Sequence, residues 1–257
     1  MHIAVILRLV PDITEELEID PSGTDIDREW IGIKLNEFDE HALEEAILLK
    51  ESGGAHVTAL ALDGEGVDRM LQSAIARGAD EAVKAEHNVA GIPDQRSAAA
   101  LLAGAINEIG ADLVLTGVQT PEDVLGQLAP YLAACMHAPT VNAVSGISAS
   151  DDSTVNVKQE YGGGISSTFS ITLPAVLGVQ TASQPPRYVS GSKLRQAMSA
   201  EIRTISVVQP ASRARAEITA LKEPERGNGA EMLEGGTDIV AAKIVAALKE
   251  RGLLGEQ

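Results

Sequence analysis

The chain has 257 residues, 37 of them acidic and 20 basic, for a net charge of −17; 44% are hydrophobic and only 2% aromatic. Nucleic-acid binding needs Lys and Arg to displace counterions and aromatic rings to stack on bases, so we expect no nucleic-acid partner. Cys135 is the single cysteine, which excludes an internal disulfide, a Cys-rich zinc site and an iron–sulfur cluster.

The first half of the chain alternates between short apolar runs and segments with helical spacing. Strands are expected at residues 3–9, 57–62, 81–85 and 112–116. Between them, apolar side chains recur at intervals of three and four residues, which is typical of amphipathic helices. Gly53, Gly78 and Gly110 are expected to end these helices, and Asp94 to cap one of them at its start. The alternation predicts a parallel sheet covered on both faces.

The second half begins with an expected helix over residues 124–136 and then changes character. Short strands are expected at residues 154–160, 167–173 and 175–179, with a turn at Gly162, Gly163 and Gly164. Residues 184–236 show little periodicity and contain four prolines, which predicts an arm or functional loop. A final amphipathic helix follows, capped by Thr237 or Asp238 and ended by Gly252.

These elements together predict an α/β fold: a Rossmann-like parallel sheet with helices on both faces, antiparallel additions and a C-terminal arm. We expect residues 1–183 to form the α/β domain and residues 184–257 to form a loop, an extended arm and a C-terminal helix. No apolar run approaches the roughly 20 residues that span a bilayer, and the start of the chain lacks signal-peptide features. We therefore expect no membrane insertion and a location in the cytoplasm or an organelle matrix.

A ligand crevice is expected where the strand order reverses. In an open parallel sheet this point lies at the carboxyl ends of two neighbouring strands, in the usual order the first and the fourth. The connections concerned are residues 6–12, 63–66 and 117–126. The last of them leads into a helix, whose free N–H groups attract phosphate. An ordinary strand-to-helix connection is the alternative interpretation of this loop.

Several motifs of catalysis and phosphate binding are missing or out of context. Ser52, Gly53 and Gly54 resemble a phosphate loop but follow a helix, so they are better explained as its C-terminal cap. Neither a G-x-G-x-x-G after the first strand nor a G-x-x-x-x-G-K-[ST] occurs anywhere. The five histidines lack metal-ligand spacing, and no Ser or Cys sits in a nucleophile elbow. The sequence therefore predicts no catalytic constellation.

The segment of residues 36–46 is more informative. Asn36 or Asp39 is expected to cap a helix, and Phe38, one of only two phenylalanines, lies at its mouth beside the expected crevice. A hydrophobic staple before a helix is the structural alternative for Phe38.

The sequence resembles the beta subunit of electron-transfer flavoproteins. The resemblance consists of motifs that occur in the same order along nearly the whole chain. Val10-Pro11-Asp12 matches the opening of that family, and residues 36–46 match N-P-F-D-E-x-A-x-E-E-A with Glu37 in place of Pro. Residues 74–80 match A-x-x-x-G-A-D, residues 112–119 match D-L-(V/I)-L-x-G-x-Q, and residues 173–176 match L-P-A-V. Gly162-Gly163, Pro186-Arg187-Tyr188 and the tail at residues 231–235 and 249–254 also match.

The resemblance implies the non-catalytic half of a heterodimer. An electron-transfer flavoprotein alpha subunit would hold most of the redox FAD, and the pair would carry electrons from flavin-dependent dehydrogenases to a downstream acceptor. It also implies an adenine nucleotide in the crevice of this chain, either AMP or a second FAD. The loop at residues 117–126 is shorter than in the family, and Pro121 offers no N–H group, so the occupant of this site stays open.

The implied site residues fall into two groups. Those for the cofactor are Ile6, Asn36, Phe38, Asp39, Leu62, Gln119, Thr120, Asp123, Gly126 and Gln127. Those for docking the partner are Arg187, Tyr188, Gly191, Leu194 and Arg195. Two functions are alternatives to the electron-carrying subunit: a stand-alone adenine-nucleotide-binding module, and a flavin-dependent enzyme in its own right. The missing acid and base residues and the low aromatic content disfavour the flavin-dependent enzyme.

Overall fold

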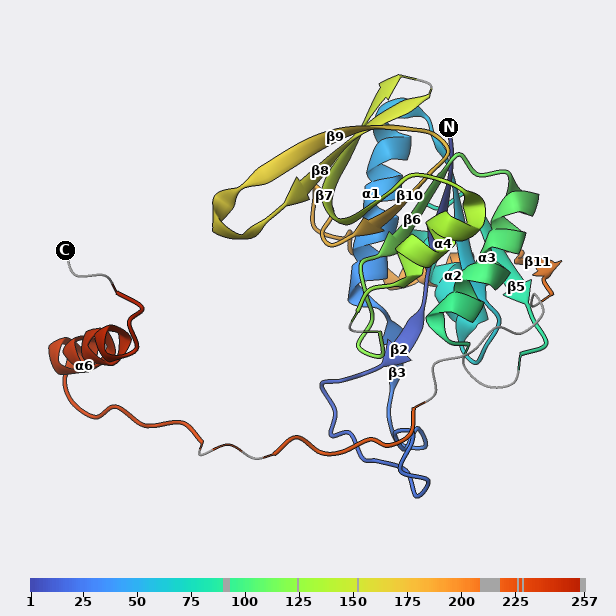
Figure 1. Cartoon of the computed structure of the whole chain (residues 1–257). Coiled ribbons are helices and arrows are strands. Elements are labelled where there is room, and N and C mark those ends of the chain that lie inside the picture. Colours follow the sequence, from blue (N-terminus) through green and yellow to red (C-terminus); the bar gives the residue numbers. More distant parts are fainter. Residues whose placement is uncertain are drawn as a thin grey trace. The chain divides into compact units, whose positions relative to one another are not determined.

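The computed structural model describes residues 1–89, 93–123, 125–151, 153–208, 218–225, 227 and 229–254. Residue contacts divide the chain into two units, Met1–Thr219 and Ala220–Gln257. The first unit contains a nine-stranded sheet and five of the helices (Figure 1), and the second contains the C-terminal helix.

The elements of the first half are the strands β1 (His2–Ile6), β2 (Leu9–Pro11), β3 (Ile33–Leu35), β4 (His56–Leu62), β5 (Glu81–Glu86) and β6 (Leu113–Gly117), with the helices α1 (Glu37–Gly53), α2 (Val67–Arg77) and α3 (Gln95–Ile109). Those of the second half are α4 (Leu128–Met136), β7 (Thr140–Asp151), β8 (Thr154–Glu160), a 3₁₀ turn (Gly162–Gly164), β9 (Ser166–Thr172), β10 (Ala175–Val179), α5 (Gly191–Ala197), β11 (Arg203–Ser206) and α6 (Thr237–Glu250).

The sheet has the order β11-β5-β4-β1-β6-β10-β7-β8-β9. The strands from β11 to β7 are parallel, and β8 pairs antiparallel with both β7 and β9. The expected parallel sheet with antiparallel additions is therefore confirmed. The strand order reverses at β1, which lies between β4 and β6, as expected for the first and fourth strands of the prediction.

Helices cover both faces of the parallel strands. Apolar side chains of α1 and α2 pack on one face, in a core that includes Val5, Leu43 and Leu115. Those of α3 and α4 pack on the other face, in a core that includes Ala4, Leu102 and Leu132. In Figure 1, α3 and α4 lie side by side in green, apart from the blue α1. Because both faces are covered there, the central strands β1, β6 and β10 are almost fully buried and mostly apolar rather than alternating.

Several expected ends of strands and helices differ from those in the structure. The first strand ends at Ile6, and Leu9–Pro11 pairs instead with Ile33–Leu35 in a separate antiparallel ribbon. The first long helix runs through Gly53, and the left-handed residue that ends it is Gly54, with φ +70°. The expected start of a helix at Val124 lies outside the described residues, and α4 begins at Leu128. The last helix is preceded by Gly236 at its cap position rather than capped by Thr237 or Asp238.

Two further corrections concern the strands. The twelve-residue β7 was missing from the expected strands because its small and polar residues alternate only weakly. The stretch 184–236, expected to lack regular structure, contains α5 and the edge strand β11, which pairs with β5. Only Ala197 of α5 and Ile205 of β11 are buried, too few to give a periodic pattern. Residues 209–217, 226 and 228 of that stretch lie outside the described residues. A division near residue 184 stays a prediction.

Candidate functional site

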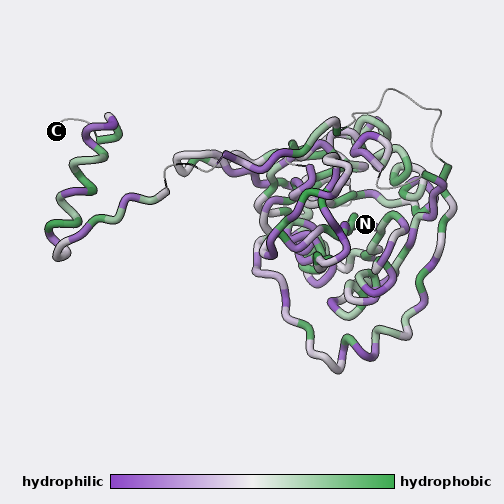
Figure 2. The backbone as a smooth tube through the Cα atoms, turned by 90° about the horizontal axis from the view of Figure 1, so that it is seen from below, coloured by the Kyte–Doolittle hydropathy of each residue, from purple (hydrophilic) through white to green (hydrophobic). Residues whose placement is uncertain are grey.

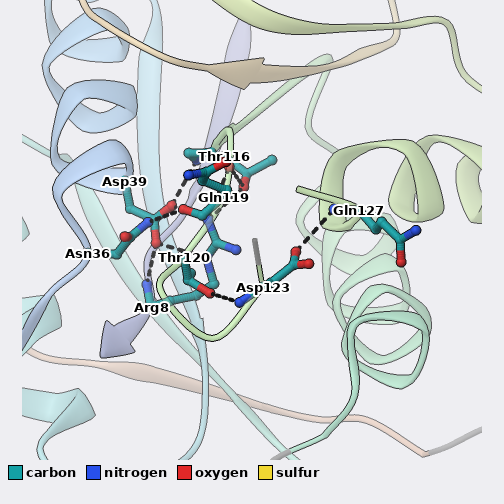
Figure 3. Close-up of polar contacts among 9 residues, drawn as sticks. Arg8, Asn36, Asp39, Thr116, Gln119, Thr120, Asp123 and Gln127 are labelled. Carbon is teal, nitrogen blue, oxygen red and sulfur yellow. Dashed lines mark hydrogen bonds and ion pairs between the residues drawn. The ribbon is translucent and has the colours of Figure 1, made fainter. Parts of the chain in front are cut away.

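The site lies at the carboxyl ends of β1 and β6, where the strand order reverses. Four connecting segments meet there: residues 7–8 after β1, the start of α1, and the loop after β6 with the start of α4. Figure 3 shows polar residues of these segments joined by hydrogen bonds and an ion pair. The crevice expected from topology therefore gathers most of the predicted cofactor residues.

Asp39 is the centre of this arrangement, and its carboxylate is fully buried. One oxygen, Oδ2, accepts hydrogen bonds from the backbone N and the Nε of Arg8, both at 2.9 Å. The other, Oδ1, accepts from Arg8 Nη2 at 2.7 Å and from the backbone N of Gly117 at 2.8 Å. Asp39 thus joins the ends of β1 and β6 to α1, a role in place of the expected helix cap.

Arg8 carries the matching positive charge. Besides its ion pair with Asp39, its Nη2 donates to the carbonyl oxygen of Gly117 at 3.1 Å. Its second terminal nitrogen, Nη1, is buried and has no hydrogen-bond partner among the described residues. Because Asp39 already balances the charge of the guanidinium, this remaining N–H suits a neutral acceptor.

Asn36 ties α1 to the loop after β6. It occupies the cap position of the helix, but its side chain makes no cap hydrogen bond. Instead its Nδ2 donates to the carbonyl oxygen of Gln119 at 2.9 Å, and its backbone N donates to that of Arg8 at 2.9 Å. The expectation that Asn36 or Asp39 caps α1 through its side chain is therefore wrong: both side chains hold neighbouring segments.

The loop between β6 and α4 closes on itself. The backbone N of Asp123 donates to the side-chain and backbone oxygens of Thr120, at 3.0 and 3.1 Å. The carboxylate of Asp123 accepts from the backbone N of Gln127 at 3.0 Å, just before α4 begins. Thr120 and Asp123 are both buried. Their polar groups serve the loop's own geometry (Figure 3).

Two glycines of this loop are required by close packing. A Cβ at Gly117 would lie 2.6 Å from the backbone N of Asp39 and the backbone C of Phe38. A Cβ at Gly126, where φ is +60°, would overlap the carbonyl oxygen of Val118. These approaches between backbones explain both glycines without reference to a ligand.

Phe38 faces a different space. It lines an open cavity of about 470 Å³ together with Tyr161, Gln180, Thr181 and neighbouring residues of the β7–β9 region. Ile6 and Leu62, at the ends of β1 and β4, instead contribute side chains to the core beneath α3 and α4. The predicted cofactor roles of these three residues stay predictions.

The predicted docking residues surround α5. Arg187 pairs with Glu44 at 2.8 Å and with Glu51 at 2.6 Å, and its backbone N also donates to Glu44. Hydrogen bonds to the Glu51 and Glu44 carboxylates raise the pKa of Arg187 above its ordinary value. The same guanidinium lowers the pKa of Glu51. Tyr188 is 93% exposed.

The other docking residues lie in the helix itself. Gly191 is the first residue of α5, and Leu194 and Arg195 follow on it, both exposed. Leu194, Tyr188 and Arg187 line a shallow cavity of about 370 Å³. The structure brings these three together, and their docking role stays a prediction.

We expect Glu44→Gln to release the segment around Arg187. Loss of the buried carboxylate weakens charge-assisted hydrogen bonds worth about 1.5–3 kcal/mol, which corresponds to at least a tenfold larger opened population. Trypsin should then cut after Arg187 roughly tenfold faster, as measured by mass spectrometry of timed digests. Glu51→Gln is the control, since Glu51 is exposed and should change the rate far less. If trypsin cut wild type and Glu44→Gln at equal rates, the hydrogen bonds of Glu44 would not be what holds the segment around Arg187.

Three residues that hold segments around the site together were not singled out from the sequence: Arg8, Glu44 and Glu45. The Glu45 carboxylate is buried and accepts from the backbone N of Ile147 and from the backbone N and Oγ of Ser183. It thereby holds β7 and the segment after β10 against α1. A signal was present, because two adjacent acidic residues interrupt the apolar run of residues 42–49 on a buried helix.

In the parts of the chain that the structure describes, no group of three or more His, Cys, Asp or Glu side chains is arranged to hold a metal ion. Within the same residues, no helix combines the length and apolar character needed to cross a bilayer.

Comparison with known proteins identifies similar chains over nearly the full length. A family model described as "Electron transfer flavoprotein domain" matches residues 26–211. The chain is 28% identical to "Electron transfer flavoprotein subunit beta" of Methylophilus methylotrophus and 29% identical to the protein of that name from Clostridium acetobutylicum, each match covering 97% of this chain and 98% of the relative. It is 30% identical to "Caffeyl-CoA reductase-Etf complex subunit CarD" of Acetobacterium woodii, over 99% of this chain and all of that protein.

Proposed function

The chain belongs to the electron transfer flavoprotein domain family, and from that premise we propose that it is the beta subunit of an electron transfer flavoprotein. It forms a heterodimer with an alpha subunit and carries electrons from flavin-dependent dehydrogenases to a downstream acceptor. The single observation that supports this most is the similarity to proteins named as beta subunits over 97% of this chain and 98% of theirs.

The C-terminal unit supports a role in a complex. None of the described residues of α6 is buried, and Ile239, Ile244 and Val245 are exposed. Hydrophobic and hydrophilic stretches alternate along this helix in Figure 2. An amphipathic helix of 14 residues has little stability in water unless its apolar face is covered. We propose that the alpha subunit covers it.

We propose that FAD bound mainly by the alpha subunit lies against the cavity beside Phe38. FAD supplies the electron-carrying chemistry when bound. The rings of Phe38 and Tyr161 and the polar side chains of Gln180 and Thr181 fit the apolar face and polar edge of such a ring system. In this proposal the chain contributes no catalytic acid or base, and its residues exclude water and orient the flavin.

Co-expression with the alpha subunit of the same genome tests the proposal. We expect a 1:1 complex that retains FAD, quantified by chromatography after heat release. Phe38→Ala should lower the FAD content of the complex without changing its thermal midpoint much, because Phe38 is only partly buried. Tyr131→Ala is the control, since Tyr131 is also partly buried but packs on the opposite face of the sheet. A chain that is monodisperse alone, binds AMP and takes up no partner or flavin would favour the stand-alone module.

A further inference from the structure

The loop between β6 and α4 already holds an anion of its own. A helix N-terminus attracts phosphate because backbone N–H groups converge there and the helix dipole favours negative charge. Just before α4, the carboxylate of Asp123 accepts from the backbone N of Gln127, the residue at the cap position of the helix, at 3.0 Å. The residue is only 8% exposed, so the carboxylate is part of the packed loop.

The neighbouring donors are directed to acceptors within the loop. The backbone N of Asp123 is bound to Thr120, and the backbone N of Gly126 donates to the carbonyl oxygen of Asp123 at 3.2 Å. The backbone N–H groups of Asp123, Gly126 and Gln127 are thus already paired within the loop. Gly126 adds no evidence for a ligand, since its missing side chain is required by the carbonyl oxygen of Val118.

Charge in the loop also opposes a phosphate. Two arginines contact it, and each is paired with carboxylates: Arg8 with Asp39, and Arg28 with Glu122 and Asp25. A phosphate here would lie beside the buried carboxylate of Asp123 with no uncompensated cation from these two side chains. Desolvating two like charges together is costly. Among the described side chains that contact the loop, the buried donor without a partner is Arg8 Nη1, and it belongs to a guanidinium whose charge is already balanced.

From these contacts we infer that Asp123 occupies the anion position at the start of α4, so the crevice of this chain binds neither AMP nor a second FAD. The described polar groups of Thr120, Asp123, Gly126 and Gln127 bind one another, and in this inference the heterodimer contains FAD only at the site shared with the alpha subunit. The inference rests on the proposed function, because the resemblance is what implies a nucleotide here.

The first measurement is the nucleotide content of the purified heterodimer. We expect one FAD and no AMP per complex, and millimolar AMP should not raise the thermal midpoint of the complex or of the full chain alone. AMP or a second FAD near one per complex, or a midpoint that rises with AMP, would overturn the inference. Absence of FAD and of a complex would overturn the proposed function instead, and the AMP titration of the full chain would still decide the inference.

A variant tests whether the carboxylate stands in an anion position. Asp123→Ala removes the acceptor of the Gln127 N–H and should lower the midpoint by about 3 °C. Millimolar AMP should restore part of that loss, because the N–H groups at the start of α4 become available. Asp94→Ala is the matched control: it removes the side-chain cap of α3, and AMP should not restore its midpoint. No recovery of Asp123→Ala by AMP, or equal recovery of both variants, would contradict this role of Asp123.

Discussion

Asp39→Asn is expected to destabilise the chain by about 3–5 kcal/mol, the cost typical of breaking a buried ion pair by removing one partner. The substitution keeps the size of the side chain but removes the charge that balances Arg8. It also places an amide NH₂ among four N–H donors from Arg8 and Gly117. The measurement is denaturant unfolding of the full chain, followed by circular dichroism.

The control for this prediction is Asp68→Asn, which breaks an ion pair of similar length at the surface. Asp68 lies 2.8 Å from Lys84, but its side chain is 60% exposed. Exposed pairs contribute up to about 1 kcal/mol, so the unfolding midpoint should change little. If both variants lost the same stability, the burial of Asp39 would not be what makes its ion pair important.

Gly117→Ala is expected to destabilise the chain by about 3 kcal/mol, at the upper end of the cost of overpacking. The added Cβ would lie 2.6 Å from backbone atoms of Phe38 and Asp39, which a side-chain rotation cannot relieve. The start of α1 must therefore move away from β6. We expect a lower unfolding midpoint and, in the complex, a lower FAD content because Phe38 moves with α1.

Gly53→Ala is the matched control, and Gly53 is the last residue of α1. No described atom lies within 4 Å of a Cβ built there, and the position has helical backbone angles. Alanine in a helix is favoured over glycine by up to about 1 kcal/mol, so this variant should be as stable as wild type or slightly more stable. A Gly117→Ala chain as stable as Gly53→Ala would contradict the close approach of α1 and β6.

Local patterns in the sequence were sufficient for the main elements of the fold. The apolar runs that became β4, β5 and β6 and the helical spacing of α1, α2 and α3 predicted a parallel sheet with helices on both faces. Asp94 caps α3 as expected, accepting from the backbone N of Arg96 and Ser97. The motifs of residues 36–46 and 112–119 also led to the family that the comparisons identify.

Hydrophobic periodicity did not predict the elements that have few buried residues. β11 contributes one buried side chain, Ile205, and α5 contributes Ala197. Their places are set by pairing with β5 and packing on α2, contacts that involve residues far away in the chain. A periodic pattern of apolar residues arises when one face is buried along a whole element. An edge strand or a short helix buries too few residues to produce such a pattern.

The location of the candidate site could be predicted from the sequence, but the contacts of its residues could not. From the usual strand order of such sheets, the sequence predicted that β1 and β6 are neighbours and that their carboxyl ends lie at one edge, and the pairing of the two strands confirms this. The contacts that each polar residue makes at this edge could be learned only from the folded chain. Asp39 turned from an expected cap into the partner of Arg8. The carboxylate of Asp123 accepts from the backbone N of Gln127, and its expected contact with a nucleotide stays a prediction. The physical reason is that an acidic side chain near a helix start suits a cap, an ion pair or a ligand site equally well. Which of these forms depends on the donors that the fold brings within hydrogen-bond distance of it.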